Sequence, residues 1–260
     1  MLSYQHGFHA GNRADVLKHA ILHATLETLA QSDTPYLYVE THAARGKYDL
    51  TGKQAQKTQE ARLGVRALPR SKAAPPALQA WLKHIEAAGV KAYPGSPLLA
   101  ADCLKAPHRL VLFEKHPTEH AELKRHLSAY ATVQIFHEDG YRGALRLQPR
   151  RQENMLIFLD PSYETDADMD ALANWVPRAL RKWPKAKLLI WLPLFADGRE
   201  EEFGAFLSSL DEGFVAGSRW TRPPGDESAL EGSAMVGLRV GGASARKAFA
   251  IAAELDKLWR

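Results

Sequence analysis

The sequence predicts an α/β protein whose mostly parallel sheet is covered by helices on both faces. Apolar, β-favouring runs alternate with helical patterns along the chain, and several runs are apolar throughout, as in strands buried on both faces. The composition agrees, because 45% of the 260 residues are hydrophobic and 25% are charged, as in ordinary globular proteins. A chain of this length can bury the core of one large domain, with or without an insertion.

The elements follow one another in a regular order. A helix with a wide apolar face is expected over 14–30, and a strand over 36–39 follows it. Six further strands are expected at 109–113, 132–136, 155–159, 187–192, 213–220 and 234–240. Helices are expected at 117–130, 165–182, 199–210 and 244–259, with a kink or break at Pro177. The long polar loop before the last strand leaves room for an antiparallel edge strand.

A loop and a helix start precede the second strand of the predicted sheet. In Tyr93-Pro-Gly-Ser96-Pro97, Ser96 has a side chain suited to an N-cap and Pro97 fits the first helical position. Further along, Cys103 has apolar neighbours on the same expected helix, where packing is its expected role.

The positive charge of the chain is concentrated in residues 51–93. Lys and Arg total 34 against 30 Asp and Glu, a formal balance of +4, but this segment alone carries +6 and the remainder −2. Two helices, over 53–67 and 76–88, are expected in the segment, separated by prolines. We therefore expect a main domain of residues 1–50 and 94–260 with an inserted basic helical subdomain at 51–93.

Basic residues in this segment recur at four-residue spacing, which places each set along one face if the segment is helical. The two sets are Lys53 with Lys57, and Arg62 with Arg66 and Arg70. Such a face is either simply solvated or contacts the phosphates of a nucleic acid. A second basic cluster, Arg142, Arg146, Arg150 and Arg151, comes shortly before the fourth strand, and contact with RNA is the favoured interpretation.

Several classes of protein are excluded or disfavoured. The single cysteine excludes a disulfide scaffold and a four-cysteine zinc module. No apolar run approaches the about 20 residues that span a bilayer, and the first residues lack the core of a signal peptide, so a cytoplasmic location is expected. His116 and His120 fit an H-x-x-E-H pattern, but Pro117 places His116 at or before a helix start. No third ligand is in register, and we expect no metal.

Acidic residues follow three successive strands of the predicted sheet. Glu114 follows the second strand, Asp139 and Gly140 the third, and Asp160 the fourth. Ligands of open α/β sheets bind outside the carboxyl ends of the strands. A carboxylate can accept hydrogen bonds from both hydroxyls of a ribose, and another can accept from an adenine amino group. The three acids together predict a ligand that contains a nucleoside.

The fourth strand ends in Asp160-Pro161-Ser162-Tyr163, which resembles the D-P-P-Y motif of S-adenosylmethionine-dependent amino-methyltransferases. The N6 lone pair of adenine is delocalised into the ring and is a poor nucleophile. Acceptors on both amino hydrogens, here the Asp160 carboxylate and the Pro161 carbonyl, favour a geometry in which this lone pair faces a methyl donor. The Tyr163 ring would stack on a base that has left its helical stack.

A closer resemblance extends from residue 1 to about 164. The chain resembles the bacterial 23S ribosomal RNA adenine-N6 methyltransferases of the RlmJ family. The stretches that carry this resemblance, in chain order, are MLSY (1–4), His6, FHAGN (8–12), ADVLKH (14–19), THA (41–43), YPGSP (93–97), EKHP (114–117), Asp139-Gly140 and Asp160-Pro161.

The resemblance implies a Rossmann-like, seven-stranded class I methyltransferase fold with a small helical subdomain inserted after the first strand. It implies S-adenosylmethionine as cofactor and 23S ribosomal RNA as partner, free of protein or in an early assembly precursor, and we expect a monomer. The implied cofactor contacts are His19, His42, Ser96, Glu114, Asp139, Gly140 and Asp160. The implied substrate-side residues are Tyr4, His6 and Lys18, to which the charge pattern adds Arg62 and Arg66. Asp160, Pro161 and Tyr163 would form the catalytic motif.

Two departures from the family pattern keep other functions open. Ser162 stands where the motif has its second proline, which restores a backbone N–H and loosens the loop. The turn after the first strand has lost glycines of the family pattern and contains Ala44, whose side chain restricts positive φ and crowds a cofactor. Since members of the family are also linked to the use of external DNA, one alternative is a nucleic-acid-binding protein of DNA uptake without catalysis. Another is a DNA adenine-N6 methyltransferase.

Overall fold

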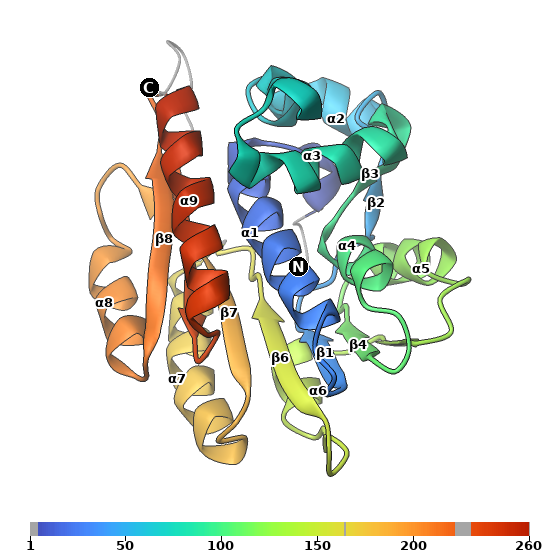
Figure 1. The fold of residues 1–260 in the computed structure, drawn as a ribbon, viewed down its shortest axis with the longest axis vertical. Coiled ribbons are helices and arrows are strands. Elements are labelled where there is room, and N and C mark those ends of the chain that lie inside the picture. Colours follow the sequence, from blue (N-terminus) through green and yellow to red (C-terminus); the bar gives the residue numbers. More distant parts are fainter. Residues whose placement is uncertain (1–4, 164, 222–229, 260) are drawn as a thin grey trace.

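A seven-stranded sheet forms the centre of the protein, in the order β5-β4-β1-β6-β7-β9-β8 (Figure 1). The computed structural model describes residues 5–163, 165–221 and 230–259. All seven predicted strands are present. Their bounds are β1 (Tyr36–Glu40), β4 (Arg109–Phe113), β5 (Val133–Phe136), β6 (Asn154–Leu159), β7 (Lys187–Phe195), β8 (Gly213–Arg219) and β9 (Leu230–Leu238).

The sheet is parallel except for β9. At its centre β1 pairs in parallel with β4 and β6, so that Val39 lies beside Val111 on one side and Ile157 on the other. β9 pairs antiparallel with both β7 and β8. The predicted antiparallel strand is thus present, but its expected position at the edge is wrong: β9 lies between β7 and β8, and β8 forms the edge.

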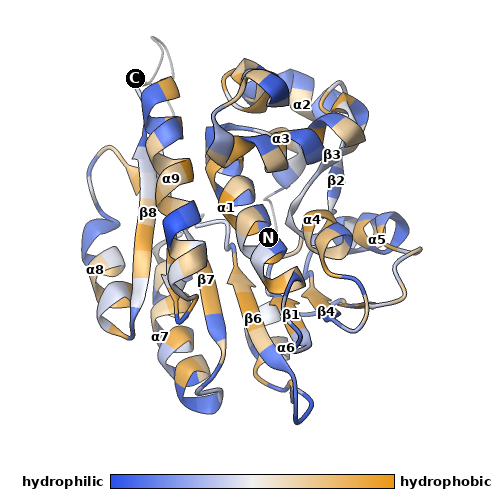
Figure 2. Ribbon diagram, in the orientation of Figure 1, coloured by the Kyte–Doolittle hydropathy of each residue, from blue (hydrophilic) through white to orange (hydrophobic). Residues whose placement is uncertain are grey.

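Helices cover both faces of the sheet, as the apolar strands predict. Successive strand residues point to opposite faces, so Tyr38 joins the buried cluster under one layer of helices and Val39 joins the other. The helices of the first layer are α1 (Arg13–Ala30), α4 (Ser96–Cys103), α5 (Pro117–His126) and α9 (Gly242–Trp259). Those of the second are α6 (Gly140–Ala144), α7 (Asp166–Lys182) and α8 (Glu201–Ser209). Figure 2 shows the apolar strands between these amphipathic layers.

Most predicted helices are confirmed, with differences at their ends. α5 is shorter than expected, and α7 continues through Pro177 instead of breaking there. Cys103 is partly buried against the first cluster, as its neighbours predict. No helix in the described ranges combines the length and the apolar character needed to cross a membrane.

The segment 51–93, which we call the insertion, begins shortly after β2 (Lys47–Tyr48) and ends at the first residue of β3 (Tyr93–Pro94). These two short strands pair antiparallel. The helix predicted over 53–67 is wrong. α2 (Lys53–Thr58) ends at Gln59, whose φ of 56° lies in the left-handed region that commonly terminates helices. Three 3-10 turns follow, η2 (Glu60–Arg62), η3 (Val65–Ala67) and η4 (Ser71–Ala73). Arg62, Arg66 and Arg70 therefore do not share one helix face.

The second helix of this segment is confirmed as α3 (Pro76–Ala88), and η5 (Val90–Ala92) leads from it into β3. α3 buries Leu78, Trp81 and Leu82 in the same apolar cluster as α1. The helix begins at Pro76, a residue suited to the first helical turn. The insertion is thus fixed on the main sheet's helical layer beside the carboxyl ends of the strands.

α1 positions the polar groups of the site. Its N-cap Asn12, which follows the 3-10 turn η1 (His6–Phe8), accepts a hydrogen bond from the Asp15 backbone N–H at 2.8 Å. The helix is buried along nearly its whole length, although it carries Asp15, Lys18 and His19. Charged side chains are almost never buried without partners, so their partners define the surroundings of the site.

Candidate active site

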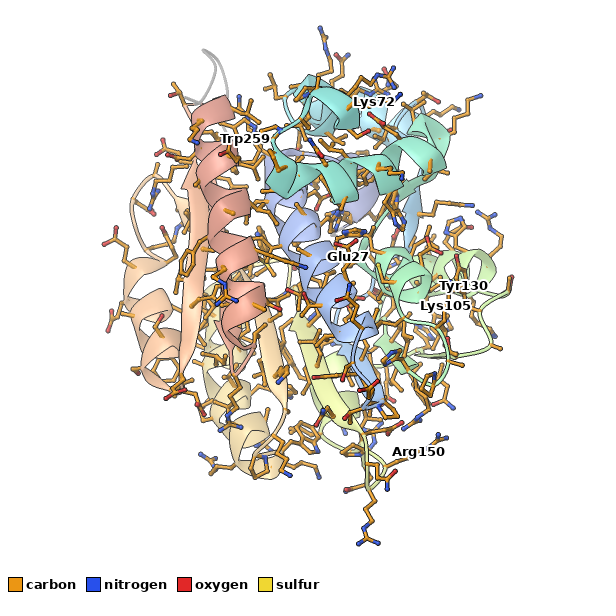
Figure 3. The ribbon with its side chains drawn as sticks, viewed as in Figure 1. Glu27, Lys72, Lys105, Tyr130, Arg150 and Trp259 are labelled. Atoms are coloured by element: carbon orange, nitrogen blue, oxygen red, sulfur yellow. The ribbon has the colours of Figure 1, made fainter. Side chains whose placement is uncertain are left out.

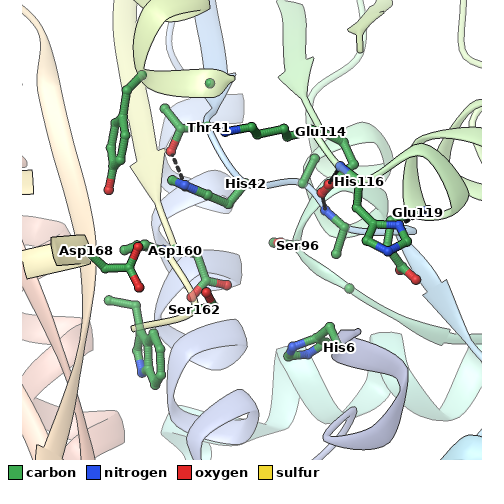
Figure 4. Close-up of a pocket in the computed structure, with 18 of the residues that line it drawn as sticks. His6, Thr41, His42, Ser96, Glu114, His116, Glu119, Asp160, Ser162 and Asp168 are labelled. Atoms are coloured by element: carbon green, nitrogen blue, oxygen red, sulfur yellow. Dashed lines mark hydrogen bonds between the residues drawn. The ribbon is translucent and has the colours of Figure 1, made fainter. Parts of the chain in front are cut away.

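A pocket of about 360 Å³ opens at the carboxyl ends of β1, β4 and β6 (Figure 4). We call it the strand-end pocket. The chain order reverses around β1, where open α/β sheets bind their ligands. All seven residues predicted to contact a cofactor line this pocket: His19, His42, Ser96, Glu114, Asp139, Gly140 and Asp160.

Glu114, after β4, is held by backbone donors. Its carboxylate accepts hydrogen bonds from the N–H of Ala44 at 2.7 Å and of His116 at 2.6 Å. Burial raises its pKa. Ala44 reaches this position with a φ of 49°, so its side chain does not prevent the left-handed conformation that was expected to be restricted. The carboxylate, with about four acceptor positions, can still accept from the hydroxyls of a ribose.

Two of the four histidines that line the pocket, His19 and His42, have lowered pKa values that favour the neutral form. Burial lowers the pKa of His19 to about 3, and its Nδ1 lies 3.0 Å from the Tyr93 hydroxyl. Burial also lowers the pKa of His42, whose Nδ1 lies 2.8 Å from the Thr41 hydroxyl (Figure 4). Neutral imidazoles suit a pocket for a cationic sulfonium nucleoside, because they add no positive charge.

Ser96 lines the pocket but is not the predicted N-cap. α4 has Gly95 at its N-cap, and the Ser96 hydroxyl donates instead to the buried Glu40 carboxylate. Glu40 also accepts from the Tyr38 hydroxyl at 3.0 Å, and burial raises its pKa well above the usual range. A buried carboxyl without these donors would be costly, which explains why Ser96 points to Glu40.

Asp139 and Gly140 bring the start of α6 close to the end of β1. The Asp139 side chain caps α6 by accepting from the Arg142 N–H at 3.1 Å. A Cβ on Gly140 would lie 1.9 Å from the Thr41 carbonyl oxygen, so only glycine allows this approach. The two residues thereby form one wall of the strand-end pocket.

Asp160 belongs to a chain of charged groups that runs into α1. Lys18 Nζ lies 2.7 Å from an Asp160 oxygen and 3.1 Å from an Asp15 oxygen. Asp15 also accepts from the Gly11 N–H at 2.8 Å and lies 2.9 Å from His6 Nε2. Burial disfavours the charged forms of Lys18 and Asp15, but their partners outweigh it. Asp160 and Asp15 raise the pKa of Lys18. His6 and Lys18 hold the pKa of Asp15 well below its usual range.

The rest of the D-P-S-Y motif separates two cavities. Pro161 and Ser162 line the strand-end pocket, whereas Tyr163 faces a second cavity. Tyr163 has a φ of 51°, and its hydroxyl donates to the Trp191 carbonyl at 2.6 Å. Its ring meets the Trp191 ring edge-on at a centroid distance of 5.4 Å. Tyr163 is thus anchored beside Asp160.

The second cavity, which we call the side pocket, has a volume of about 450 Å³ and shares His6, Ser162 and Trp191 with the strand-end pocket. Its lining includes Lys18 and Tyr163. The insertion contributes Thr58, Glu60 and Leu63, and α1 with its N-terminal approach contributes His9, Asn12, Arg13, Ala14 and Asp15. The side pocket therefore joins the insertion to the Asp160 end of the site.

The remaining predicted substrate residues have different positions. Tyr4 lies outside the described residues. Arg62 and Arg66 are exposed on the insertion and line neither pocket. Arg62 donates to the Gln59 side chain at 2.7 Å, and Arg66 donates to the Leu50 carbonyl at 2.8 Å.

The second basic cluster is divided: Arg142 lies in α6, whose first residues line the strand-end pocket, and Arg146 follows that helix. Arg150 and Arg151 precede β6, whereas Asp160 follows it, and a strand of six residues separates them by about 20 Å. Figure 3 shows Arg150 at the end of the molecule opposite the insertion residue Lys72. Proximity in sequence to the motif was misleading because the strand itself lies between them.

The sequence-based predictions omit Asp15 and Trp191. Asp15, Lys18 and His19 are spaced to share one face of α1, and this charged face on an otherwise apolar helix was a usable signal. Trp191 lines both pockets, and Lys18 Nζ lies 4.9 Å from its ring centroid. No local pattern distinguishes it from a tryptophan of the core.

Within residues 5–163, 165–221 and 230–259, no group of three or more potential ligands could hold a metal ion. His116 instead caps α5, with its Nδ1 3.2 Å from the Thr118 N–H. This agrees with the effect expected of Pro117 on the H-x-x-E-H pattern.

Comparison with known proteins gives three concordant results. The sequence model of the family described as "Ribosomal RNA large subunit methyltransferase D, RlmJ" matches residues 33–240. Proteins named ribosomal RNA large subunit methyltransferase J are 33% identical in Escherichia coli K12 and 31% identical in Haemophilus influenzae, each over 75% of this chain and 71% of the relative. A crystal structure from Legionella pneumophila has a TM-score of 0.87 and 27% identity, covering 96% of this chain and 94% of that one.

Proposed function

Since the chain belongs to the RlmJ family of ribosomal RNA large subunit methyltransferases, we propose that it methylates N6 of one adenine in 23S ribosomal RNA. The methyl donor is S-adenosylmethionine. The observation that carries the proposal is the convergence on one pocket of three strand-end acids and two neutral histidines, with Asp160 at the boundary to a second pocket.

The residues of the strand-end pocket fit the cofactor. Glu114 is fixed by two backbone donors and would accept from the ribose hydroxyls. Asp139 and Gly140 would contact the adenine, and His19, His42 and Ser96 would complete the contacts. When bound, S-adenosylmethionine supplies an activated methyl group on a sulfonium, so this chemistry needs no metal.

Asp160 and Pro161 orient the target amine. The Asp160 carboxylate and the Pro161 carbonyl would accept from the two amino hydrogens, which directs the nitrogen lone pair away from the motif and toward the strand-end pocket. The Tyr163 ring forms the neighbouring wall for the base, held by its hydroxyl on the Trp191 carbonyl. Ser162, which replaces the second proline of the motif, leaves the Pro161 carbonyl and the Tyr163 ring in place.

Lys18 and His6 support this arrangement from α1. Lys18 is paired with both Asp160 and Asp15, so it restricts the orientation of the Asp160 carboxylate and remains protonated. His6 lines both pockets and is held on Asp15. We assign both side chains to the substrate side, where a flipped adenine would lie beside the Lys18–Asp160 pair.

The partner and location follow from the same proposal. The exposed cations of the insertion, which we continue to treat as a subdomain of residues 51–93, would contact RNA phosphates. The enzyme would act in the cytoplasm, as a monomer, on 23S RNA that is free of protein or in an early assembly precursor. Such RNA would allow the target adenine to leave its stack.

The test is transfer of labelled methyl groups to protein-free 23S RNA from a strain that lacks this gene. We expect the wild-type protein to label one adenine and Asp160→Ala to reduce the rate by about 10²- to 10⁴-fold, the usual contribution of such positioned groups. Asp170→Ala is the matched control, because Asp170 is an exposed aspartate on α7 that lines neither pocket. Circular dichroism checks that both variants are folded.

A parallel assay uses DNA that lacks adenine methylation. Labelling of DNA in place of RNA would assign the enzyme to the other polymer. Two outcomes would contradict the proposed methylation and favour the binding protein of DNA uptake. In one, the protein binds the cofactor but labels neither polymer. In the other, the protein binds nucleic acid but does not bind the cofactor.

A further inference from the structure

The side pocket contains more surface than the target adenine needs. His6, Lys18, Ser162, Tyr163 and Trp191 surround the end of the pocket nearest to Asp160. The remaining lining includes a continuous set of apolar and aromatic side chains that the proposed methyl transfer does not use. They are Leu63, Pro193, Phe195, Trp220 and Leu230.

These side chains come from separate parts of the chain. Leu63 belongs to the insertion and is 45% exposed. Pro193 and Phe195 come from the last residues of β7, and Trp220 follows β8. The folded chain brings distant segments together in one apolar wall that is only partly exposed, and such a wall is better explained as a binding surface than as a gap in the packing.

Trp220 is held in position before any ligand binds. Its backbone N–H donates to the Glu231 carbonyl at 2.9 Å, which extends the pairing of β8 with β9. Its ring meets the Trp259 ring edge-on, with an interplanar angle of 85° and a centroid distance of 5.5 Å. Trp259 lies near the end of α9, on the side of the molecule that carries the insertion (Figure 3).

Arg13 adds positive charge to the same wall. Its guanidinium carbon lies 5.9 Å from the centroid of Trp220, and its Nε donates to the Leu63 carbonyl at 3.2 Å. Its Nη1 donates to the Thr221 carbonyl at 3.1 Å. Arg13 therefore connects the insertion with the end of β8, and the aromatic wall and the insertion are fixed relative to each other.

An aromatic ring, an apolar wall and a guanidinium are the groups that bind an unstacked nucleobase and its phosphate. We propose that the side pocket binds the base of a nucleotide adjacent to the target adenine, stacked on Trp220, with Arg13 beside it. This inference rests on the proposed function, because a strand that delivers an adenine to Asp160 carries its neighbour toward the adjoining side pocket. The bound neighbour would make recognition depend on the flanking nucleotide.

The experiment measures kcat/KM on short RNAs that contain the mapped target adenine. One RNA is intact, and two carry an abasic residue on the 5′ or the 3′ side of the adenine. Removing a stacking ring weakens binding of one base by about fivefold to 100-fold. We expect Trp220→Ala to lower kcat/KM on the intact RNA by this factor, whereas Trp220→Phe should retain most of the wild-type kcat/KM. The affinity for S-adenosylmethionine should be unchanged in both variants.

The abasic RNAs separate stacking from a structural effect. With the base that occupies the pocket removed, wild type and Trp220→Ala should have equal kcat/KM, because nothing remains to stack. Equal losses by Trp220→Ala on all three RNAs, or wild-type activity that neither abasic residue lowers, would overturn the proposal. Leu63→Ala should show the same RNA-dependent loss to a smaller extent without disturbing Trp259. If wild type labels no RNA at all, the proposed function fails, whereas failure of the subsite leaves wild-type labelling intact.

Discussion

The strand-end pocket and the side pocket share three residues but are built in opposite ways. The ends of parallel strands form the first, and backbone N–H groups hold its acid Glu114 in place. The second joins the insertion, the approach to α1 and the antiparallel part of the sheet. One pocket therefore has a geometry set by the sheet, whereas the other depends on contacts between segments that are far apart in the chain.

This difference separates two kinds of recognition. The strand-end pocket presents carboxylates and neutral histidines, which suit a small cationic nucleoside of fixed shape. The side pocket presents apolar and aromatic side chains together with Arg13, which suit an unstacked base and its phosphate. Asp160, paired with Lys18, lies where the two meet. Changes that separate the two functions therefore test whether the pockets are independent.

Among the variants that compare the two pockets by ligand binding, the largest effect is expected from Gly140→Ala in the strand-end pocket. Its new Cβ would lie 1.9 Å from the Thr41 carbonyl oxygen, a backbone atom that cannot simply turn away. Overpacking of this kind costs about 1–3 kcal/mol, and we expect S-adenosylmethionine affinity to fall at least about tenfold as α6 moves from β1. Calorimetry with the cofactor and denaturant unfolding provide the two measurements.

Gly242→Ala is the matched control, because its nearest neighbour would be the flexible end of Arg246 at 3.5 Å. Affinity for RNA in the absence of cofactor should be similar in both variants. If Gly140→Ala weakens RNA binding as strongly as cofactor binding, the two pockets are not independent.

A smaller effect is expected when charge is reversed on the insertion. Arg62→Glu with Arg66→Glu should weaken RNA binding and reduce the slope of log affinity against log salt by about 0.7 for each RNA phosphate that the protein no longer neutralises. Cofactor affinity should not change, since neither residue lines the strand-end pocket. Arg62→Glu alone is the cleaner variant, because Arg66 also donates to the Leu50 carbonyl.

Arg178→Glu with Arg181→Glu is the control for net charge. Both residues are exposed in the last turns of α7, about 15 and 20 Å along the helix from Asp168 in the strand-end pocket. RNA binding that falls equally in both double variants would show only a general effect of charge, and the insertion would have no special role.

The two pockets also differ in how far the sequence predicts them. Glu114, Asp139 and Asp160 each follow an apolar run, and parallel strands necessarily bring such residues to one edge. The family resemblance adds His19, His42 and Ser96. No comparable rule exists for Leu63 and Trp220, which meet across more than half of the chain only through tertiary packing.

Errors in the secondary structure have the same origin. One helix is expected over 53–67, with Arg62 and Arg66 on the same face, but Gln59 adopts a left-handed conformation and ends α2. The turns that follow are held by long-range contacts, such as the Val65 N–H on the Gly11 carbonyl at 2.8 Å. Ser96 is drawn from a capping role by Glu40, a partner 56 residues away. Local propensity is overridden where a distant group offers a better contact.

The smallest effect concerns pH. His9 Nδ1 lies 2.7 Å from a Glu60 oxygen and joins the approach to α1 with the insertion, and the hydrogen bond to Glu60 raises the pKa of His9. Its stabilisation is complete below the unfolded pKa of about 6.5 and is lost as pH rises through the higher folded pKa. Since His9 is 40% exposed, we expect the free-energy difference between wild type and His9→Gln to be below about 1 kcal/mol.

Denaturant unfolding of both proteins between pH 5.5 and 9 measures this difference, which should be largest at acidic pH and vanish at alkaline pH. Glu60→Gln should remove the same pH-dependent component. His19 should contribute no matching change in cofactor affinity, because its pKa of about 3 keeps it neutral throughout this range. A difference that grows with pH would mean that the His9–Glu60 contact does not hold the insertion as a charged pair. The assembly of the side pocket should therefore respond to pH through the contact between His9 and Glu60.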